Sequence, residues 1–393
     1  MSYLLGMLGP INLADFREYL YPESWRDDLP KGLGGSPVNL LSCELLKRGH
    51  RLVIFTLDPA VQDEVILEGN NLRICIGPFR PKRARDFFAV EREYLLRAIK
   101  RDRPDILHAQ WTYEYALSAQ ASGLPHVITA HDAPLNILRH NFIPYRIART
   151  LMAYWVLFRA KRVISVSPHV ENHLRRFMFY RGAKGVIPNG MPGPLFERTD
   201  SVQRVGNDVT FATILSGWGG LKNGQVAIEA FALHRRRRPN DRLIMFGAGH
   251  GAGEAADIWA QENKMDVGIE FAGEMPYQSL LNRLADEVDV LVHPSLEEAF
   301  GMTLIEAMAL SIPVIGGRDS GAVPWTLGEG EAGILVDATS PDEFAVAMSS
   351  LAEKEDARHR LGRKGRLYAE QRFHIRAVAD AYERAYRDLI EAS

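Results

Sequence analysis

The stretch HPSLEEAFGMTLIEAMAL, residues 293–310, is the most informative part of this chain. Apolar residues before it predict a strand that ends at His293, and the residues after Gly301 have the period of a helix over Thr303–Leu310. The first amides of that helix have no partner within it and lie at the positive end of its dipole. A glycine-led helix start of this kind suits a bound phosphate.

Two carboxylates of this stretch, Glu298 in the loop and Glu306 in the helix, would lie beside the phosphate site. Carboxylates near an anion are unfavourable unless they bind something neutral and rich in hydroxyls, from which they accept strong hydrogen bonds. The residues themselves therefore indicate a sugar-phosphate site. The alternative is that Glu298 is a solvated loop residue and that Glu306 only complements the helix dipole.

Short apolar strands alternate with helical segments on both sides of this stretch, which predicts doubly wound α/β domains with parallel sheets. The strands are expected at Tyr3–Leu8, Arg51–Leu57, Leu72–Ile76, Ile106–Gln110, His126–Ala130, Arg162–Val166, Val209–Leu215, Arg242–Phe246, Ile269–Ala272, Val288–His293, Val314–Gly316 and Gly333–Val336. A Pro- and Gly-marked segment, Met191–Asn207, is expected to link two domains. This gives domains over 1–197 and 198–371 and a C-terminal helix over 372–393 that can return to the first domain.

The spacing Glu298-x7-Glu306, with its flanks, resembles the signature of the retaining nucleotide-sugar glycosyltransferases of family 4. That family has the GT-B fold, in which two Rossmann-like domains face a central cleft. The resemblance implies that Glu298 contacts hydroxyls of the transferred sugar and that Glu306 binds the ribose of the donor. It also implies donor contacts at the start of the helix, from Phe300, Gly301, Met302 and Thr303.

Two segments of the first half also resemble this family. The loop containing Gly34 and Gly35 resembles its first glycine loop, where the backbone approaches a diphosphate or an acceptor closely. Asn39 departs from the histidine that the family often has there. His131 follows a predicted strand and resembles the family's histidine over the reaction centre, where an imidazole binds sugar hydroxyls or supports developing charge.

In the second half, the loop between residues 216 and 224 resembles the place where the family has an Arg followed by a Lys, both facing the donor diphosphate. Lys222 matches the Lys, and its charge would stabilise the leaving group. The Arg is absent, because Gly217, Trp218 and Gly219 occupy its place. Arg318 could substitute for it, or it could be an ordinary surface residue.

A second glycine motif leaves an oxidoreductase open. Gly247-Ala-Gly249-His-Gly-Ala252 follows a predicted strand and fits the dinucleotide fingerprint, with Glu270 about 20 residues further on. An NAD-dependent oxidoreductase would follow from this motif alone. In the family 4 reading, Gly249 instead brings the backbone close to the donor nucleotide.

Composition narrows the classes of protein further. The chain has 393 residues, of which 46% are hydrophobic and 24% charged, which excludes disordered, collagen-like and coiled-coil proteins. Two cysteines are too few for a disulfide framework and favour the cytoplasm. The sequence shows neither a signal peptide nor a run of apolar residues long enough to span a membrane.

Charge is distributed unevenly, because residues 1–197 carry 26 Lys and Arg against 19 Asp and Glu, whereas residues 198–393 carry 21 against 30. The segment Arg139–Arg162 combines basic residues with Trp155 and Phe158, as an interfacial helix on an anionic membrane does. A helix packed in the first core is the alternative. The run Arg235–Arg238 reads as a solvated helix end, so no nucleic-acid partner is expected.

The chain has no Asp-x-Asp and no spacing typical of metal ligands, so we expect metal-independent transfer without a cofactor. The expected reaction moves a sugar, with retention, from a nucleoside-diphosphate sugar to a glycan, lipid-linked or small-molecule acceptor that the sequence does not specify. The candidate catalytic residues are His131, Glu298 and Lys222; the candidate donor-binding residues are Gly34, Gly35, Lys222, Gly249, Glu298, Phe300, Gly301, Met302, Thr303 and Glu306. A nucleotide-sugar-binding protein without transferase activity remains a second class, and a phosphorylase a third.

Overall fold

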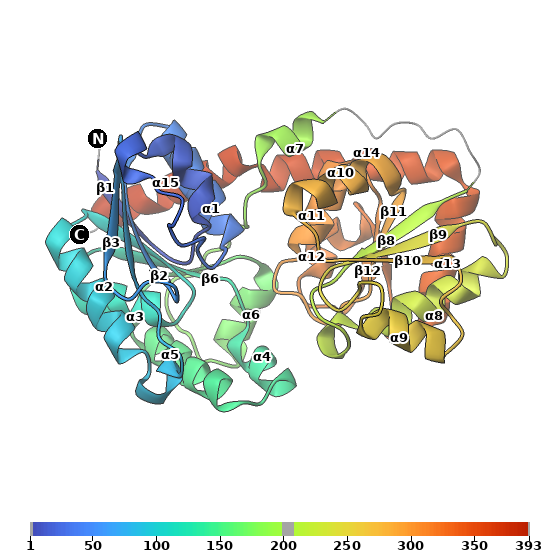
Figure 1. The fold of residues 1–393 in the computed structure, drawn as a ribbon, viewed down its shortest axis with the longest axis horizontal. Helices are drawn as coiled ribbons and strands as arrows, with labels where there is room; N and C mark the ends of the chain where they lie inside the picture. The colour runs from blue at the N-terminus through green and yellow to red at the C-terminus, as the bar shows by residue number, and fades with distance from the viewer. Residues whose placement is uncertain (1–2, 199–207, 392–393) are drawn as a thin grey trace. The chain divides into compact units, whose positions relative to one another are not determined.

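The computed structural model describes residues 3–198 and 208–391. The chain forms two compact units, one of residues 1–190 with 375–393 and the other of residues 191–374 (Figure 1). The sequence placed these boundaries at 197/198 and 371/372, a few residues from those of the units.

The first unit is built on a seven-stranded sheet whose order is β3-β4-β2-β1-β5-β6-β7. Its strands are β1 (Leu4–Leu8), β2 (Arg51–Asp58), β3 (Val65–Gly69), β4 (Leu72–Pro78), β5 (Ile106–Gln110), β6 (His126–Ala130) and β7 (Val163–Ser165). All neighbours are parallel except β3, which pairs antiparallel with β4 at the edge. The sequence did not predict β3. It is joined to β4 by a tight turn at Asn71, whose φ is 61°.

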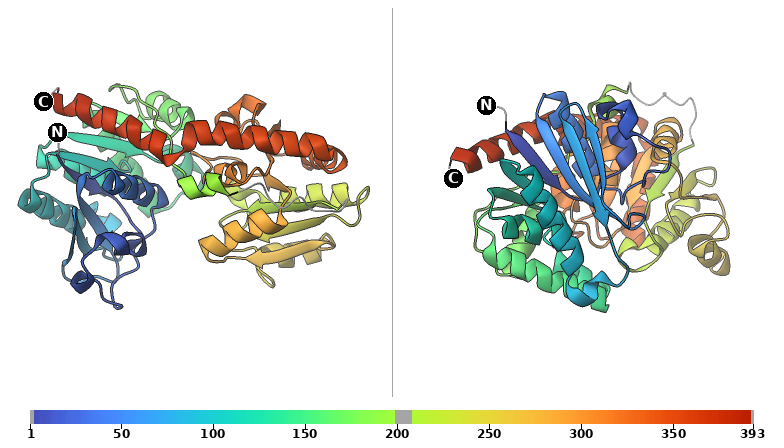
Figure 2. Two further views of the ribbon diagram at one scale, coloured as in Figure 1. Left: turned by 90° about the horizontal axis from the view of Figure 1, so that it is seen from above. Right: turned by 60° about the vertical axis from the view of Figure 1, so that its left-hand side comes forward.

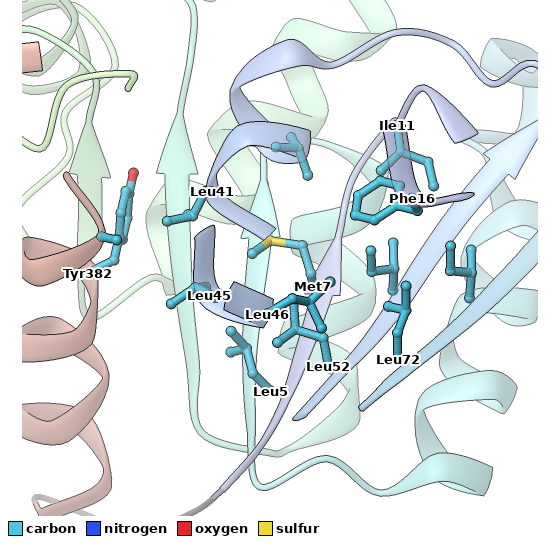
Figure 3. Packing of buried hydrophobic residues seen from close by; sticks show 14 of the residues in the cluster. Leu5, Met7, Ile11, Phe16, Leu41, Leu45, Leu46, Leu52, Leu72 and Tyr382 are labelled. Atoms are coloured by element: carbon cyan, nitrogen blue, oxygen red, sulfur yellow. The ribbon is translucent and has the colours of Figure 1, made fainter. Parts of the chain in front are cut away.

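Helices cover the strands of this first sheet, as the parallel topology requires. They are α1 (Ser36–Lys47), α2 (Ala89–Asp102), α3 (Glu114–Ser122), α4 (Pro134–His140), α5 (Pro144–Arg159), α6 (Pro168–Arg176) and α15 (Ile375–Glu391). The last helix packs beside α1, and Figure 2 shows it alongside the blue strands. Its residue Tyr382 lies in the same buried cluster as Leu5, Leu41 and Leu45 (Figure 3).

The second unit has a six-stranded, fully parallel sheet of order β10-β9-β8-β11-β12-β13. Its strands are β8 (Thr210–Ile214), β9 (Arg242–Phe246), β10 (Ile269–Gly273), β11 (Val290–His293), β12 (Val314–Gly317) and β13 (Ile334–Val336). Its helices are α7 (Gly193–Glu197), α8 (Gly224–Arg235), α9 (Ala255–Glu262), α10 (Tyr277–Glu287), α11 (Met302–Ala309), α12 (Val323–Thr326), α13 (Pro341–Glu353) and α14 (Glu355–Phe373). If β3 is left aside, both sheets have the Rossmann order 3-2-1-4-5-6.

The expected linker and the expected last helix both differ from the structure. The segment expected as an irregular linker contains the short helix α7, and its residues 199–207 lie outside the described residues. The last helix was predicted to run unbroken from Arg372, but His374 is extended, with φ −61° and ψ 132°. His374 pairs with Met191 in a parallel bridge and stacks on Phe196, and both contacts require this break.

Candidate functional site

The stretch that the sequence singled out lies at the carboxyl edge of the second sheet. Strand β11 ends at His293 as predicted, and helix α11 begins at Met302, one residue earlier than expected. Gly301 precedes the helix with φ 83°, and a Cβ there would lie 2.6 Å from the Leu304 side chain. Only glycine tolerates both conditions, so Gly301 fixes the direction in which the first amides of α11 point.

Glu298, in the loop between β11 and α11, forms an ion pair with Lys222. The Lys222 Nζ donates a hydrogen bond of 2.6 Å to Glu298 Oε1, and Nε2 of His293 lies 3.3 Å from the same oxygen. Burial alone would raise the pKa of Glu298, but the adjacent imidazole of His293 and the ammonium of Lys222 lower it to about 2. Glu298 is therefore an ionised carboxylate at neutral pH, held between two nitrogen groups.

The backbone around Glu298 is anchored on the next strand connection. The Glu298 carbonyl accepts a 2.8 Å hydrogen bond from the Ala322 amide, and Glu298 forms a parallel bridge with Gly321. Gly321 has φ 65°, and a Cβ there would lie 2.4 Å from the Glu298 carbonyl oxygen. This close approach fixes the position of Glu298 from the backbone side.

Lys222 is placed by a glycine-rich loop between β8 and α8. Gly217, Gly219 and Gly220 all have positive φ, so the loop follows a path that favours glycine. Asn223 then donates through Nδ2 to the carbonyls of Pro294 and Ala338, at 3.1 and 2.8 Å. Asn223 thereby holds this loop beside the end of β11. Nothing in the sequence pattern indicated this role.

Trp218 is one of the residues at the position of the missing arginine, and its ring packs against other aromatic side chains. Trp218 lies against the rings of His250 and Trp259, with centroids 5.6 and 5.7 Å away. Its indole therefore supplies no cation to a diphosphate. Arg318, the suggested substitute, is exposed and forms a 2.5 Å ion pair with Glu343 of α13.

Glu306 lies in α11 and is only 6% exposed. Its Oε1 accepts a 2.9 Å hydrogen bond from the hydroxyl of Tyr277, the first residue of α10. Burial raises the pKa of Glu306, although this hydrogen bond opposes the shift. The Tyr277 ring is half exposed beside this carboxylate, so it is a further candidate for contact with a ligand. Nothing in the sequence pattern marked it.

Several polar side chains near these strand ends are buried without a hydrogen-bond partner among residues 3–198 and 208–391. They include the hydroxyls of Thr213, Ser295 and Ser320 and the Nε2 of His250. A buried polar group without a partner is costly, and proteins rarely leave one. Their gathering at one edge of the sheet is typical of a site whose partners come with a ligand or water.

Gly249 and Phe300, two further residues predicted to bind the donor, differ in their surroundings. Gly249 has φ 86°, and a Cβ there would lie 3.2 Å from the Trp218 amide, so this loop lies close beside the glycine-rich loop. The side chain of Phe300 is 4% exposed and packs against Trp325 and Phe373. Its role is structural, and the donor contact expected of it is limited to its backbone.

The dinucleotide fingerprint is also explained structurally. A Cβ at Gly247 would lie 1.9 Å from the Leu215 carbonyl oxygen, so this glycine serves strand packing. Helix α9 begins only at Ala255, several residues beyond the motif. Glu270, which would bind a ribose in a dehydrogenase, forms a 2.9 Å ion pair with Arg283. These contacts oppose the oxidoreductase alternative.

In the first unit, His131 follows β6 and lies beside the end of β5. Its Nε2 is 2.6 Å from Gln110 Oε1, and its ring lies 4.4 Å from the Trp111 ring. Trp111 has φ 64°, an unusual conformation for a bulky residue that often marks a functional position. Burial lowers the pKa of His131 to about 3, so the imidazole is neutral.

The glycine loop of the first unit caps α1. Gly35 has φ 102°, and a Cβ there would lie 2.1 Å from the Pro10 carbonyl oxygen, whereas Gly34 has open space around it. Asn39 is buried and donates to the Asn12 carbonyl and to Asp15 Oδ2, at 2.8 and 2.7 Å. Asn39, which departs from the family pattern, therefore holds the preceding loop together.

The structure thus brings Lys222, Glu298 and His293 into contact and places Glu306 on the adjoining helix. Gly34, Gly35 and His131 lie in the first unit. Within the described ranges, no group of three His, Cys, Asp or Glu side chains could hold a metal ion. None of the described helices is long and apolar enough to cross a membrane.

Both halves of the chain match glycosyltransferase families. Residues 38–192 match the family described as Glycosyltransferase Family 4, and residues 213–368 match Glycosyl transferases group 1. A D-inositol 3-phosphate glycosyltransferase of Segniliparus rotundus is 25% identical over 94% of this chain and 87% of its own. One from Corynebacterium kroppenstedtii is 32% identical, over 42% of this chain and 39% of its own length.

Solved structures show the same fold. The sucrose-phosphate synthase of Thermosynechococcus elongatus aligns over the whole of both chains with a TM-score of 0.77 and 21% identity. Anabaena Alr3699/HepE, solved in complex with UDP-glucose, aligns over 98% of this chain and 100% of its own, with a TM-score of 0.69 and 16% identity. The two family models together span most of the chain, so it is a glycosyltransferase of the family 4 type, and the solved structures show that its fold is GT-B.

Proposed function

We propose that this protein transfers a sugar, with retention of anomeric configuration, from a nucleoside-diphosphate sugar to a hydroxyl-bearing acceptor. The observation that carries the proposal is the ionised Glu298 held by Lys222 beside the start of α11. A carboxylate for sugar hydroxyls, a cation and helix amides for phosphate are the groups that such a donor requires. The UDP-glucose complex of Anabaena Alr3699/HepE supports a donor of this class.

Lys222 would act on the leaving group. An ammonium has three N–H donors, and Glu298 takes one of them in the structure, so others remain for diphosphate oxygens. Its charge stabilises the negative charge that develops as the bond between the sugar and the phosphate breaks. Glu298 would at the same time accept hydrogen bonds from sugar hydroxyls, and so orient the anomeric carbon.

Glu306 and Tyr277 would hold the nucleotide. In the protein without ligand, Glu306 is buried and its pKa is raised, and ribose hydroxyls would give its carboxylate further hydrogen bonds.

In the proposed reaction the acceptor hydroxyl attacks from the face that the diphosphate leaves, and its proton passes to the departing phosphate oxygen. The acceptor oxygen replaces the phosphate oxygen on the anomeric carbon, so atoms and charges balance without a metal or cofactor.

A panel of nucleoside-diphosphate sugars tests this function in two steps. A ligand at 100 times its dissociation constant stabilises the folded protein by about 2.7 kcal/mol, which a thermal-shift assay detects. Donors that stabilise the protein are then assayed for release of nucleoside diphosphate. Release supports the transferase.

Binding without release from any donor would favour the second class, a nucleotide-sugar-binding protein. The packing of Trp218 where the family has an arginine keeps that class in view. A protein stabilised by none of the donors would contradict both classes.

We also propose that the first unit contacts an anionic membrane surface. Between Asp132 and Glu197 the chain has 10 Lys and Arg but one acidic residue, Glu171. On α5, Trp155 is 56% and Phe158 is 91% exposed. Aromatic side chains beside cations suit the headgroup region of an anionic bilayer.

The basic residues of this segment differ in their exposure. Arg149 is largely buried over the Tyr113 ring, and it donates to the Tyr145 hydroxyl. Arg159 lies over the exposed Trp155 ring, and Lys161, two residues further along the chain, is also exposed. Arg159 and Lys161 are therefore the cations that we propose for the membrane surface, whereas Arg149 belongs to the interior.

Vesicle flotation tests this surface with phosphatidylglycerol-containing and pure phosphatidylcholine vesicles. Binding to the anionic vesicles should fall on raising the salt concentration and in the double variant Trp155→Ser/Phe158→Ser. Val346→Ser, which removes an apolar side chain of the second unit that is 67% exposed, is the control. Equal binding by wild type and the double variant would refute the surface.

A further inference from the structure

A chain of buried hydrogen bonds joins His131 to the C-terminal helix. His131 Nε2 contacts Gln110 Oε1 at 2.6 Å, and Gln110 Nε2 lies 3.1 Å from His108 Nε2. His108 Nδ1 then contacts the hydroxyl of Tyr386 in α15 at 2.7 Å. His108, Gln110 and Tyr386 are at most 2% exposed. A residue near the end of the sequence is thus linked to the candidate catalytic histidine through two side chains.

A branch of the same chain reaches a second tyrosine of α15. The hydroxyl of Thr129 lies 2.7 Å from His108 Nε2 and 3.0 Å from the hydroxyl of Tyr382. Tyr382 and Tyr386 are both buried and stack at 6.1 Å. The two tyrosines therefore share a helix, and the rings of both pack against the His108 ring. Their hydroxyls differ: that of Tyr386 hydrogen-bonds to His108 Nδ1 directly, whereas that of Tyr382 is linked to His108 only through Thr129.

The protons on His131 and His108 can be assigned from which neighbouring atoms can donate or accept a hydrogen bond. A glutamine oxygen only accepts, so Nε2 of His131 carries the proton that Gln110 receives. The Gln110 amide nitrogen faces the Met7 sulfur at 3.3 Å and His108 Nε2, and both must accept from it. Burial and the nearby His131 lower the pKa of His108 to about 3, so this ring is neutral. Its single proton is then on Nδ1, and the Tyr386 hydroxyl accepts it.

We propose that Tyr386 is a positioning residue that fixes the tautomer of His131 through His108 and Gln110. While Tyr386 accepts from His108 Nδ1, the amide of Gln110 keeps its oxygen toward His131, and His131 presents the lone pair of Nδ1. No residue of the described chain hydrogen-bonds to that nitrogen. His131 thus serves as an acceptor for a substrate hydroxyl and does not donate to it.

The same assignment of donors and acceptors predicts what happens when the Tyr386 hydroxyl is removed. His108 Nδ1–H would be buried without an acceptor, whereas its Nε2–H could donate to Thr129. The tautomer of His108 would therefore reverse. Gln110 would turn its oxygen toward His108 and its nitrogen toward His131, and the proton of His131 would move from Nε2 to Nδ1. A substrate hydroxyl would then meet a donor where it needs an acceptor.

The experiment compares Tyr386→Phe with Tyr382→Phe in the full chain. Both variants remove one buried hydroxyl from the same helix, but only the first removes the acceptor of His108 Nδ1–H. The tautomer of His131 is read by 15N NMR of the histidine-labelled protein, with the signal assigned from His131→Gln. We expect protonated Nε2 in wild type and in Tyr382→Phe, and protonated Nδ1 in Tyr386→Phe.

A kinetic comparison accompanies the NMR measurement and rests on the proposed glycosyl transfer. Losing a group that orients a functional histidine costs on the order of tenfold or more in activity. We expect this loss in kcat/KM for Tyr386→Phe alone, with the two variants melting at similar temperatures. An unchanged His131 tautomer in Tyr386→Phe would overturn the proposal, and so would equal activity losses in both variants.

The two readouts separate this proposal from the proposed function. If Tyr386→Phe reverses the tautomer and no donor is turned over by wild type, the positioning role stands and the transferase assignment fails. If donors are turned over and the tautomer does not change, the transferase assignment stands and the positioning role fails.

Discussion

The two sheets have the same strand order once β3 is left aside, but the side chains at their carboxyl edges differ in charge. In the second unit the groups are charged: Lys222 and Glu298 pair as ions beside the start of α11. In the first unit they are neutral: His131, Gln110 and His108 form a buried hydrogen-bonded chain. The topology decides where side chains gather, and the residues decide whether the site suits a phosphate or hydroxyl groups.

The charged edge should be the more sensitive to mutation, and Lys222→Ala should give the largest effect. Losing one preorganised electrostatic group costs about a hundredfold to a thousandfold in turnover. We expect a fall of this size in kcat/KM with the donor that wild type uses.

Arg318→Ala is the matched control, because its exposed pair with Glu343 predicts no more than about a fivefold change. A comparable loss in that control would show that Arg318, and not Lys222 alone, holds the diphosphate.

The two glutamates of the charged edge should differ in their effect on stability. The pKa of Glu298 falls from 4.5 to about 2, which corresponds to about 3 kcal/mol of stability. This stability is present above pH 4.5 and is lost as the pH falls toward 2. Glu298→Gln should therefore lower the free energy of unfolding at pH 7, measured by urea titration.

Glu306→Gln should have the opposite sign in the same measurement. Burial raises the pKa of Glu306, so its ionised form destabilises the free protein above the pKa of the unfolded state. The glutamine variant should unfold at equal or higher urea concentration at pH 7 while it loses affinity for nucleotide. A strongly destabilised Glu306→Gln would show that this carboxylate serves folding and not a ligand.

The neutral edge should respond to acid before the charged edge does. The pKa values of His108 and His131 lie near 3, below the 6.5 of an unfolded histidine, so the unfolded state gains protons first as the pH falls. Each histidine then lowers stability by up to about 1.4 kcal/mol per pH unit below pH 6.5. His131→Gln should flatten this slope, whereas His140→Gln, at an exposed position, should leave it unchanged.

Chelation should have the smallest effect. If Lys222 and the amides of α11 stabilise the leaving diphosphate, ethylenediaminetetraacetate should leave the initial rate within error of the untreated rate. An absolute requirement for added magnesium would contradict this mechanism.

Much of the charged edge could be predicted from sequence because its residues are close together in the chain. The strand end at His293, the turn at Gly301 and the spacing to Glu306 are local features, and the structure has them where the pattern indicates. Lys222 was found through resemblance in a loop. Its contact with Glu298 could not be predicted from sequence. The hydrogen bonds that place this loop beside Glu298 run from Asn223 to residues that follow two other strands.

At the neutral edge only His131 was found from sequence, by resemblance; the hydrogen-bonded chain behind it could not be predicted, because its members lie far apart in the sequence. His108 and Tyr386 are 278 positions apart, and no local pattern indicates that they touch. Tyr277 likewise meets Glu306 from another helix. The break at His374 depends on pairing with Met191, so the helical period of the last segment could not reveal it.

The configuration of the product is the sharpest test of the sugar transfer with retention that we propose at the Lys222–Glu298 site. Wild-type protein is incubated with α-linked nucleoside-diphosphate sugars and an acceptor that supports release of nucleoside diphosphate, and the anomeric proton is read by NMR. We expect an α-linked product that disappears in Lys222→Ala. A β-linked product, or an α-linked product formed equally well by Lys222→Ala, would contradict this proposal.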